Sequence, residues 1–348
     1  MLKRICAGAL LASMLLGLTA CGGDTATTNP SAPAGGEAST PPSGETVVLR
    51  LSQSTPSDNP VSEALTYFSE QVDELTGGSV KVEVHFDAAL GSEPASIEGL
   101  TLGTLEMARV ATANMASFVP ELEVFNLPFL FRDSDHYWAV LNGEVGDFFK
   151  EKFEENGFKL LTFYEDGTRN IYHTDKFIET VEDLQGVKIR TMTSPMIQKA
   201  FTTMGAAPTP MDFGELYTAL QQGVVDAGEN NYSTIYTSKQ YEVAPYITTT
   251  EHYRIPSVLI MSMSSWESLT PEQQEQVQQA ADLSCEWEIP HFIEADQEYL
   301  QAALEDGAKE QAMPQEERDR LVEMLQPIYE ECNEQVGNDL VTKILETK

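Results

Sequence analysis

The chain has 348 residues, more than twice the length of a usual single domain, so two domains are expected. Hydrophobic and charged residues occur in ordinary globular proportions, but 55 acidic residues against 21 basic ones give a formal net charge of −34. This charge excludes nucleic acid as a partner and adhesion to an anionic membrane through a basic patch, because both need clustered lysine and arginine. A small anionic ligand would need a local pocket of arginines.

The N-terminus predicts export and lipid attachment. Two basic residues precede an apolar run, residues 5–18, that is too short to span a bilayer, so residues 1–20 are predicted to be a signal peptide. The run ends in Leu18-Thr19-Ala20-Cys21, which resembles a bacterial lipobox. Cys21 is therefore the predicted lipidation site and the first residue of the mature protein. The alternative is a plain signal peptide in which Cys21 has no role.

The segment after Cys21 predicts a tether. Residues 21–46 are mainly small residues and proline, a composition that cannot form a core, and they are predicted to be a flexible, lipidated tether. The folded part is then expected to be extracytoplasmic and lipid-anchored to the bacterial cell membrane. Only Cys285 and Cys332 remain in that part, and the sequence leaves open one disulfide or two free thiols. No cysteine or histidine cluster predicts a metal, and no cofactor is predicted.

The folded part begins with alternating strands and helices. Apolar residues at every second position predict strands at 47–52, 80–86 and 106–111. Asn59 is expected to cap a helix that has Pro60 at its first position and ends at the glycine pair 77–78. A short helix is expected around 97–100. This order predicts a mostly parallel sheet, in which ligands bind beyond the carboxyl ends of the strands.

The same alternation continues and predicts a second α/β unit. Expected strands are 158–163, 187–192, 224–227 and 256–262, and expected helices are 195–204 and 215–220. Thr270 and Gln273 form a capping-box pattern that starts a long helix to about residue 304. A kink is expected at Pro290, because an interior proline removes a hydrogen bond. Pro327 and Gly337 are expected to divide the last helical stretch.

Motifs of catalysis are missing from the sequence, so an enzyme is not predicted. The chain contains no nucleophile elbow, phosphate-binding loop, zinc-protease motif or dinucleotide motif. The five histidines are scattered. His291 and Glu294 share a helical spacing, but a partly exposed helix surface explains this pair better than a metal site. Acidic residues are too numerous for a catalytic acid and base to be named.

A family resemblance rests on two segments that follow one another. Gly167-Thr168-Arg169 is followed by Asp183-Leu184-Gln185-Gly186-Val187-Lys188-Ile189-Arg190. Together they resemble the G-x-R and D-L-x-G-x-K-x-R pattern of the solute-binding proteins of tripartite ATP-independent periplasmic (TRAP) transporters, the DctP family. The segment 205–230, which contains Phe213 and Asn230, also resembles that family's most recognisable block. The similarity covers roughly residues 47–348.

The resemblance implies a receptor and not an enzyme. Such a protein binds an organic acid, either a sugar acid or a dicarboxylate, between two domains and delivers it to TRAP membrane permease subunits. The implied fold is a two-domain, periplasmic-binding-protein-like α/β fold with hinge strands and a long C-terminal helix linking the domains. Domain I would comprise 47–167 and 256–296, and domain II would comprise 168–255 and 297–348. A lipoprotein receptor of an ATP-driven importer is the alternative function.

The resemblance also implies ligand-binding residues. The family's carboxylate-binding arginine matches Arg190, a second arginine matches Arg169, the packing aromatic matches Phe213 and the polar contact matches Asn230. In the first domain the matching positions include Ser54, Glu93 and Asn114. By the same resemblance, Ala111 and Asn114 stand where the sialic-acid branch uses Glu and Arg, which argues against sialic acid.

Residue chemistry supports part of this assignment independently. In the strand 187–192, the period of two places Lys188 and Arg190 on the same face, with Arg190 near the carboxyl end. A planar guanidinium binds a carboxylate through two parallel hydrogen bonds, which lysine cannot reproduce. The residues alone leave simpler roles open, namely ion pairs with nearby carboxylates for both arginines, core packing for Phe213 and a helix cap for Asn230.

Overall fold

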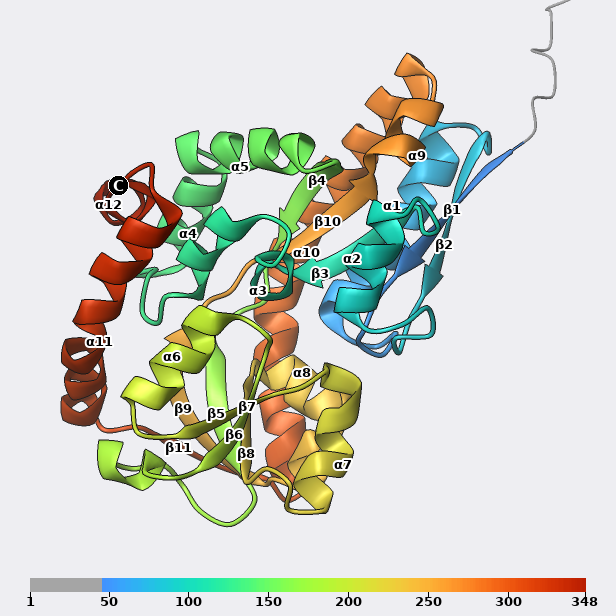
Figure 1. The fold of residues 1–348 in the computed structure, drawn as a ribbon. Coiled ribbons are helices and arrows are strands. Elements are labelled where there is room, and N and C mark those ends of the chain that lie inside the picture. Colours follow the sequence, from blue (N-terminus) through green and yellow to red (C-terminus); the bar gives the residue numbers. More distant parts are fainter. Residues whose placement is uncertain (1–45) are drawn as a thin grey trace, which may run out of the picture. The chain divides into compact units, whose positions relative to one another are not determined.

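The computed structural model describes residues 46–348, and the predicted signal peptide, the lipobox with Cys21 and the tether up to residue 45 lie outside the described residues. Two β-sheets organise the described part of the chain (Figure 1). The first has five strands in the order β2-β1-β3-β10-β4, and the second has six in the order β11-β9-β5-β8-β6-β7. Mixed α/β structure with two sheets agrees with the predicted fold class.

The first sheet contains most of the strands expected from the N-terminal half. Its strands are β1 (Val47–Ser52), β2 (Val80–His85), β3 (Met107–Ala111), β4 (Phe158–Tyr164) and β10 (Ser257–Ser262). β1 pairs in parallel with β2 and β3, as predicted, but β10 is antiparallel to both β3 and β4. β1, β2, β3 and β4 therefore run in the same direction, as expected for a mostly parallel sheet, and β10 is the antiparallel strand among them. β10 enters directly from the second sheet through a short segment, with no crossover helix to reverse its direction.

Helix α1 (Pro60–Leu75) forms as its sequence signals predict. The Asn59 side chain accepts a hydrogen bond from the backbone N–H of Val61 at 3.1 Å, and Pro60 occupies the first helical turn. Apolar side chains of α1, including Leu65 and Phe68, are buried in one core cluster with strands of the first sheet. The predicted short helix is α2 (Glu93–Thr101), and α3 (Thr112–Met115) follows β3 directly.

The second sheet contains the strands that the sequence reveals least well. Its strands are β5 (Arg169–His173), β6 (Lys188–Thr191), β7 (Ala207–Pro210), β8 (Ala227–Asn230), β9 (Tyr246–Tyr253) and β11 (Lys309–Ala312). β5 is antiparallel to β8 and β9, so this sheet is mixed as well. The strand expected at 224–227 lies instead at 227–230, because Val224 is exposed in a turn and the buried strand begins at Ala227. Its helices are α6 (Pro195–Thr203), α7 (Leu216–Gln221) and α8 (Tyr232–Thr237).

The chain passes between the two sheets at three places. Residues 165–168 connect β4 to β5, and residues 254–256 connect β9 to β10. The third connection is α10 (Pro271–Glu305), which contacts β4 near one end and α8 near the other (Figure 1). α10 begins with the predicted capping box of Thr270 and Gln273, and Pro290 lies inside it without ending it.

The remaining helices include the C-terminal pair. They are α4 (Ser134–Leu141), α5 (Glu144–Glu155), α9 (Met263–Ser268), α11 (Gln315–Val336) and α12 (Leu340–Glu346). The expectation that Pro327 divides the last helical stretch is wrong, because α11 continues through it while burying Leu321, Leu325 and Ile328. Gly337, with φ +69°, does end the helix, as predicted.

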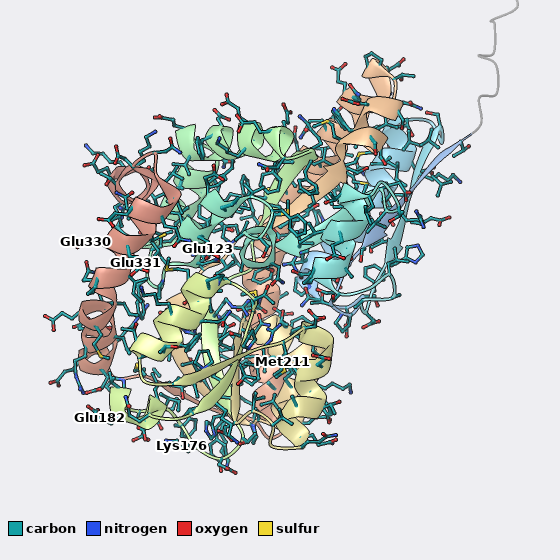
Figure 2. The ribbon with its side chains drawn as sticks, viewed as in Figure 1. Glu123, Lys176, Glu182, Met211, Glu330 and Glu331 are labelled. Atoms are coloured by element: carbon teal, nitrogen blue, oxygen red, sulfur yellow. The ribbon has the colours of Figure 1, made fainter. Side chains whose placement is uncertain are left out.

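The C-terminal helices touch elements attached to both sheets. α11 contacts α6, which follows β6, and also the 3₁₀ helix Pro120–Asn126, which follows β3. Lys199 of α6 forms an ion pair with Glu331 of α11, which is labelled in Figure 2. The division of the chain into the two predicted domains, with 297–348 in domain II, stays a prediction.

Two features of the described residues bear on the classes of function considered. Cys285 and Cys332 are both free thiols, so the two-thiol alternative holds in this structure. Within residues 46–348, no helix is long and apolar enough to cross a membrane, and no group of acidic, histidine or cysteine side chains is arranged to hold a metal ion.

A buried polar cluster ties the three connections between the sheets together. Arg254, in the second connection, donates from Nε to Glu165 Oε1 of the first connection at 3.0 Å. Glu288 of α10 accepts a hydrogen bond from the backbone N–H of Glu165 at 3.1 Å. Both carboxyl groups are fully buried, and each has one oxygen without a hydrogen-bond partner among the described residues. This cluster places two carboxyl groups next to one cation.

We expect Glu288→Gln to change how stability depends on pH. Burial, and after it the Glu165 carboxylate, raises the pKa of Glu288 well above its ordinary value of 4.5. The folded state therefore keeps a proton that the unfolded chain loses above pH 4.5, and stability contributed by this group is lost as pH rises from there through the folded-state pKa. The difference in melting temperature, variant minus wild type, should rise as the pH is raised from 4.5.

The matched control for this experiment is Glu286→Gln. Glu286 is exposed on the same helix, so its replacement removes an equal charge without touching the buried cluster. Melting temperatures measured by calorimetry across the pH series should show no trend for this control. Equal pH trends for both variants would contradict the role assigned to Glu288.

Candidate ligand-binding site

A cavity of about 260 Å³ lies next to the connections between the two sheets. Its volume is close to the lower end of the range for small-molecule sites, about 300 Å³. The structure brings all seven sequence-predicted ligand-binding residues to its lining: Ser54, Glu93, Asn114, Arg169, Arg190, Phe213 and Asn230. Residues far apart in the sequence therefore meet in one pocket.

The positions of these residues follow from the strand ends of each sheet. Ser54 comes after β1, and Asn114 lies in α3 directly after β3, so both occupy the carboxyl edge of parallel strands. Arg190 is near the carboxyl end of β6, and Asn230 is the last residue of β8, which is parallel to β6. This is the edge at which α/β sheets bind their ligands.

Arg190 is a buried cation without a carboxylate partner. Its side chain is 3% exposed, and no carboxylate of the described residues lies within ion-pair distance. Nε donates to the backbone carbonyl of Met211 at 3.0 Å, and the guanidinium lies 5.7 Å from the centre of the Phe213 ring (Figure 2 labels Met211). Burial is the largest influence on Arg190 and lowers its pKa. An anion in the pocket would supply the missing counter-charge.

Arg169, in contrast, already has a counter-ion. Its guanidinium donates to the carboxylate of Glu229, with one of these hydrogen bonds at 2.9 Å, and to the backbone carbonyl of the same residue at 2.8 Å. Nη1 donates to Asn230 Oδ1 at 3.0 Å. Burial opposes the charge, but the Glu229 carboxylate outweighs it and raises the pKa of Arg169. The alternative role of Arg169 as part of an ion pair is therefore realised here, at the wall of the pocket.

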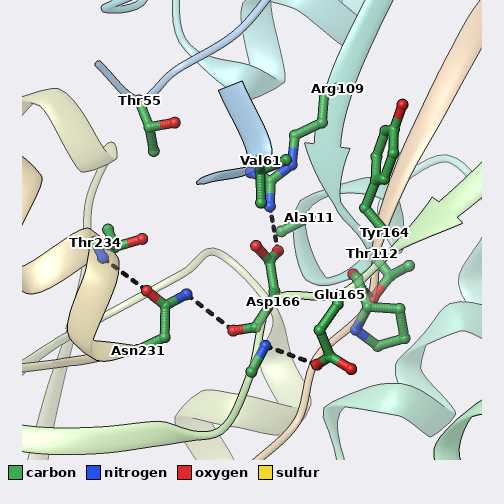
Figure 3. Close-up of polar contacts among 12 residues, drawn as sticks. Thr55, Val61, Arg109, Ala111, Thr112, Tyr164, Glu165, Asp166, Asn231 and Thr234 are labelled. Atoms are coloured by element: carbon green, nitrogen blue, oxygen red, sulfur yellow. Dashed lines mark hydrogen bonds and ion pairs between the residues drawn. The ribbon is translucent and has the colours of Figure 1, made fainter. Parts of the chain in front are cut away.

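A third arginine, Arg109 of β3, lines the cavity from the first sheet, opposite Arg169 and Arg190 of the second sheet, and Figure 3 shows its contact with Asp166. It forms an ion pair with Asp166 of the first connection, and its Nη1 is 3.7 Å from Glu93 Oε1. The backbone carbonyl of Asp166 accepts a hydrogen bond from Asn231 at 2.9 Å. Burial raises the pKa of Asp166 to about 6, although Arg109 and then Arg169 act in the other direction. At neutral pH this wall holds one cation and two carboxylates.

Glu93 is the centre of a hydrogen-bond network in that wall. Oε1 accepts from the Ser54 hydroxyl at 2.9 Å, and Oε2 accepts from the backbone N–H of Ala111 at 2.9 Å and from Asn114 Nδ2 at 2.8 Å. Each donor comes from a different element of the first sheet's edge. Glu93 therefore fixes the side chains of both other residues predicted for this wall.

The structure distinguishes between the alternative roles that the sequence left open for Phe213 and Asn230. Phe213 is partly exposed and stacks with Arg190, while its other contacts are with a core cluster, so it is not simply a core residue. Asn230 does not cap α8. The cap is Asn231, whose Oδ1 accepts from the backbone N–H of Thr234 at 2.7 Å. Asn230 faces the pocket and accepts from Arg169.

Hydrogen bonds across the pocket link the parts of the molecule that carry the two sheets. Asn59, at the start of α1, donates from Nδ2 to the hydroxyls of Thr234 and Thr237 of α8, at 3.2 and 3.4 Å. On another side, Thr193 donates to Asn114 Oδ1 at 3.2 Å. These contacts hold opposite walls of the site against each other.

Sequence reasoning missed three charged residues of the site: Arg109, Asp166 as a pocket residue, and Glu229. Arg109 had a detectable signal, because it is the one charged residue in a strand that is otherwise apolar and fully buried. Glu229 had none, since one carboxylate among 55 acidic residues cannot be distinguished by pattern.

Comparisons with known proteins agree with this architecture. The model of the family described as bacterial extracellular solute-binding protein, family 7, matches residues 51–335. A relative named solute-binding protein from Chromohalobacter salexigens is 33% identical over 276 residues, which cover 79% of this chain and 82% of the relative.

Two solved structures are similar over most of their length. The sugar acid binding protein DctPAm from Advenella mimigardefordensis, in complex with galactonate, is 33% identical, with a TM-score of 0.85 and coverage of 87% of this chain and 98% of that one. A TRAP periplasmic solute-binding protein from Sulfurospirillum deleyianum, with bound succinate, is 32% identical, with a TM-score of 0.83 and coverage of 87% and 99%.

Proposed function

Since the chain belongs to family 7 of the bacterial extracellular solute-binding proteins, the solute receptors of TRAP transporters, we propose that its pocket binds the carboxylate of an organic acid on Arg190. Arg169, Asn230, Phe213 and the Ser54–Glu93–Asn114 network complete the site. The receptor then delivers the acid to its TRAP permease subunits and performs no chemistry. The family match argues against the alternative of an ATP-driven importer.

One observation carries this proposal. Among residues 46–348, Arg190 is 3% exposed, lines the pocket and has no carboxylate partner, whereas the other two buried arginines each pair with an acidic residue. A buried charge is costly unless it is paired. The ligand carboxylate is the natural partner, because it can accept two parallel hydrogen bonds from the guanidinium.

The proposal is tested by a thermal-shift screen. Galactonate, succinate and related acids are compared with galactitol, which has hydroxyl groups of the same kind and no carboxylate. A ligand present well above its dissociation constant raises the melting temperature by mass action. We expect at least one acid to do so and galactitol to have no effect. A shift with galactitol alone, or with no compound of the series, would contradict the proposal.

A second test of the proposed function concerns closure of the site around the ligand, and it replaces Asn59, whose side chain donates hydrogen bonds to α8. Serine at this position can still cap α1, but it is too short to reach α8, so Asn59→Ser removes only the two hydrogen bonds across the pocket. Each is worth about 0.5 to 1.5 kcal/mol, so the loss of both should lower affinity for the acid found in the screen by about fivefold to a hundredfold. The melting temperature without ligand should change little.

The control is Asp133→Ser, which replaces the cap of α4 far from these contacts. Calorimetry should give wild-type affinity for this variant, and small-angle scattering of the wild type should show compaction when the acid binds. Normal affinity in Asn59→Ser would show that these hydrogen bonds play no part in closure.

Membrane attachment through Cys21 is the last part of the proposal, supported by the lipobox pattern. Cys21→Ser should prevent lipidation and release the protein from the membrane fraction, because stable anchoring needs more than one acyl chain or an additional signal. Fractionation of cells after a salt wash measures this. A variant that stays with the membranes would show that Cys21 is not the anchor, and Cys332→Ser, a change in the folded part, is the matched control.

A further inference from the structure

We propose that this pocket selects an acid with a single carboxylate and several hydroxyl groups, and that Glu93 is the residue that rejects a second carboxylate. The inference depends on the proposed function, because it takes Arg190 as the place where the ligand's first carboxylate binds. It distinguishes between the two ligand classes, sugar monoacids and dicarboxylates, that the family resemblance leaves open.

The argument begins with the charges of the pocket lining. Arg169 is neutralised by Glu229, so it offers hydrogen bonds but no free charge. Arg190 is the only buried arginine of the described residues without such a partner, and it can balance one carboxylate. Asp212 and Glu215 also line the pocket, but Asp212 is partly exposed and Glu215 is exposed, so Arg190 remains the buried charge without a partner and one anionic group of a ligand is accommodated in this half of the site.

The opposite wall has the wrong sign for a second anion. Arg109 is its one cation, and it is shared between two carboxylates, those of Asp166 and Glu93. The wall thus carries a net negative charge of one at a pH above the pKa of Asp166, which is about 6. The Glu93 carboxylate also raises the pKa of Arg190, so the two groups interact electrostatically across the same pocket. A dicarboxylate anchored on Arg190 would bring its second charge toward this wall.

Hydroxyl groups, in contrast, match what this wall offers. Carboxylate oxygens of Glu93 and Asp166 accept hydrogen bonds from hydroxyls, while the hydroxyl of Ser54 and the amide of Asn114 can both donate and accept. A ligand hydroxyl acts as donor and acceptor, so it can use either kind of group. This wall therefore favours a polyhydroxylated chain over a second carboxylate.

Glu93 is assigned the larger part in rejection because of how it is held. Hydrogen bonds from Ser54, Ala111 and Asn114 fix its carboxylate from three elements, so it cannot turn away from an incoming anion. Arg109 Nη1, at 3.7 Å from Oε1, adds a cation beside these three hydrogen bonds. A like charge placed against a fixed and poorly solvated carboxylate is a strong element of rejection.

The test compares acids of equal length by isothermal titration calorimetry at pH 7.5. The two pairs are galactonate with galactarate, and erythronate with meso-tartrate, in which each second member has a carboxylate in place of the terminal hydroxymethyl group. We expect galactonate or erythronate, the acids with a single carboxylate, to bind at least about a hundredfold more tightly than the dicarboxylate of the same length. In Glu93→Gln this preference should shrink by about tenfold or more.

The control is Glu98→Gln, which removes the same charge from an exposed position of the same helix and should leave the preference unchanged. Melting temperatures identify any loss of folding in either variant. A dicarboxylate that binds as tightly as its partner, or an unchanged preference in folded Glu93→Gln, overturns this inference and leaves the proposed function intact. Failure of all four acids, with succinate and other acids also inactive, overturns both.

Discussion

Arg190→Ala is expected to lower affinity for the acid found in the screen by about a hundredfold or more. A hydrogen bond to a charged group is worth roughly 1.5 to 3 kcal/mol, two parallel bonds are lost, and each 1.4 kcal/mol corresponds to about tenfold in affinity. Arg190→Lys keeps the charge but loses the paired geometry, so it should lose about tenfold. Calorimetry on both variants should therefore give two separate steps in affinity.

The melting temperature without ligand distinguishes a ligand-binding role of Arg190 from a structural role. Without ligand, Arg190 is a buried cation with no carboxylate partner in the described part of the chain, and its removal relieves a cost of burial. The melting temperature of unliganded Arg190→Ala should therefore stay the same or rise. Arg50→Ala, at an arginine that pairs with Glu106 away from the pocket, is the control and should bind normally. A variant of Arg190 that melts early and binds normally would contradict the assignment to the site.

Local signals explain why the first sheet was predictable. Asn59, Pro60 and the alternating strand residues act within a few positions of one another, and the structure forms α1 and β2 where they indicate. The capping box at Thr270 is equally local and starts α10 at the expected residue. Features set by neighbouring residues could thus be read from the sequence.

The direction and pairing of several strands could not be read in this way. β10 is apolar and buried along its whole length, and nothing in such a run shows whether its partners are parallel or antiparallel. β7 contains two prolines in four residues, which fits an edge strand but would count against any strand in the sequence. β11 is polar and mostly exposed at the other edge.

The ion-pair partners of the charged groups in the site could not be predicted from the sequence either. The family pattern located Arg169 and Arg190, and both line the pocket. It could not show that they differ in charge balance, because that difference comes from Glu229, which reaches Arg169 only in the folded chain. Which acidic residue pairs with which arginine depends on their distance in the folded chain. The spacing of the residues in the sequence does not show this distance.

The difference between the two arginines leads to an opposite prediction for Arg169. Arg169→Met leaves Glu229, which is fully buried, without its cation. Removing one partner of a buried ion pair costs about 3 to 5 kcal/mol, because an uncompensated charge stays in the interior. We expect Arg169→Met to lower the melting temperature by many degrees even without ligand, as measured by calorimetry.

The double variant Arg169→Met with Glu229→Gln decides whether the loss comes from the unpaired charge. It removes both charges, so most of the lost stability should return, since neutral replacement of a buried pair is often nearly without cost. Arg320→Met, which breaks ion pairs with Glu182 and Glu317 at the surface, is the control, and it should cost no more than about 1 kcal/mol for each pair. If the double variant is as unstable as Arg169→Met alone, the hydrogen bonds of Arg169 to Asn230 and to the Glu229 carbonyl hold this wall, and the ion pair does not.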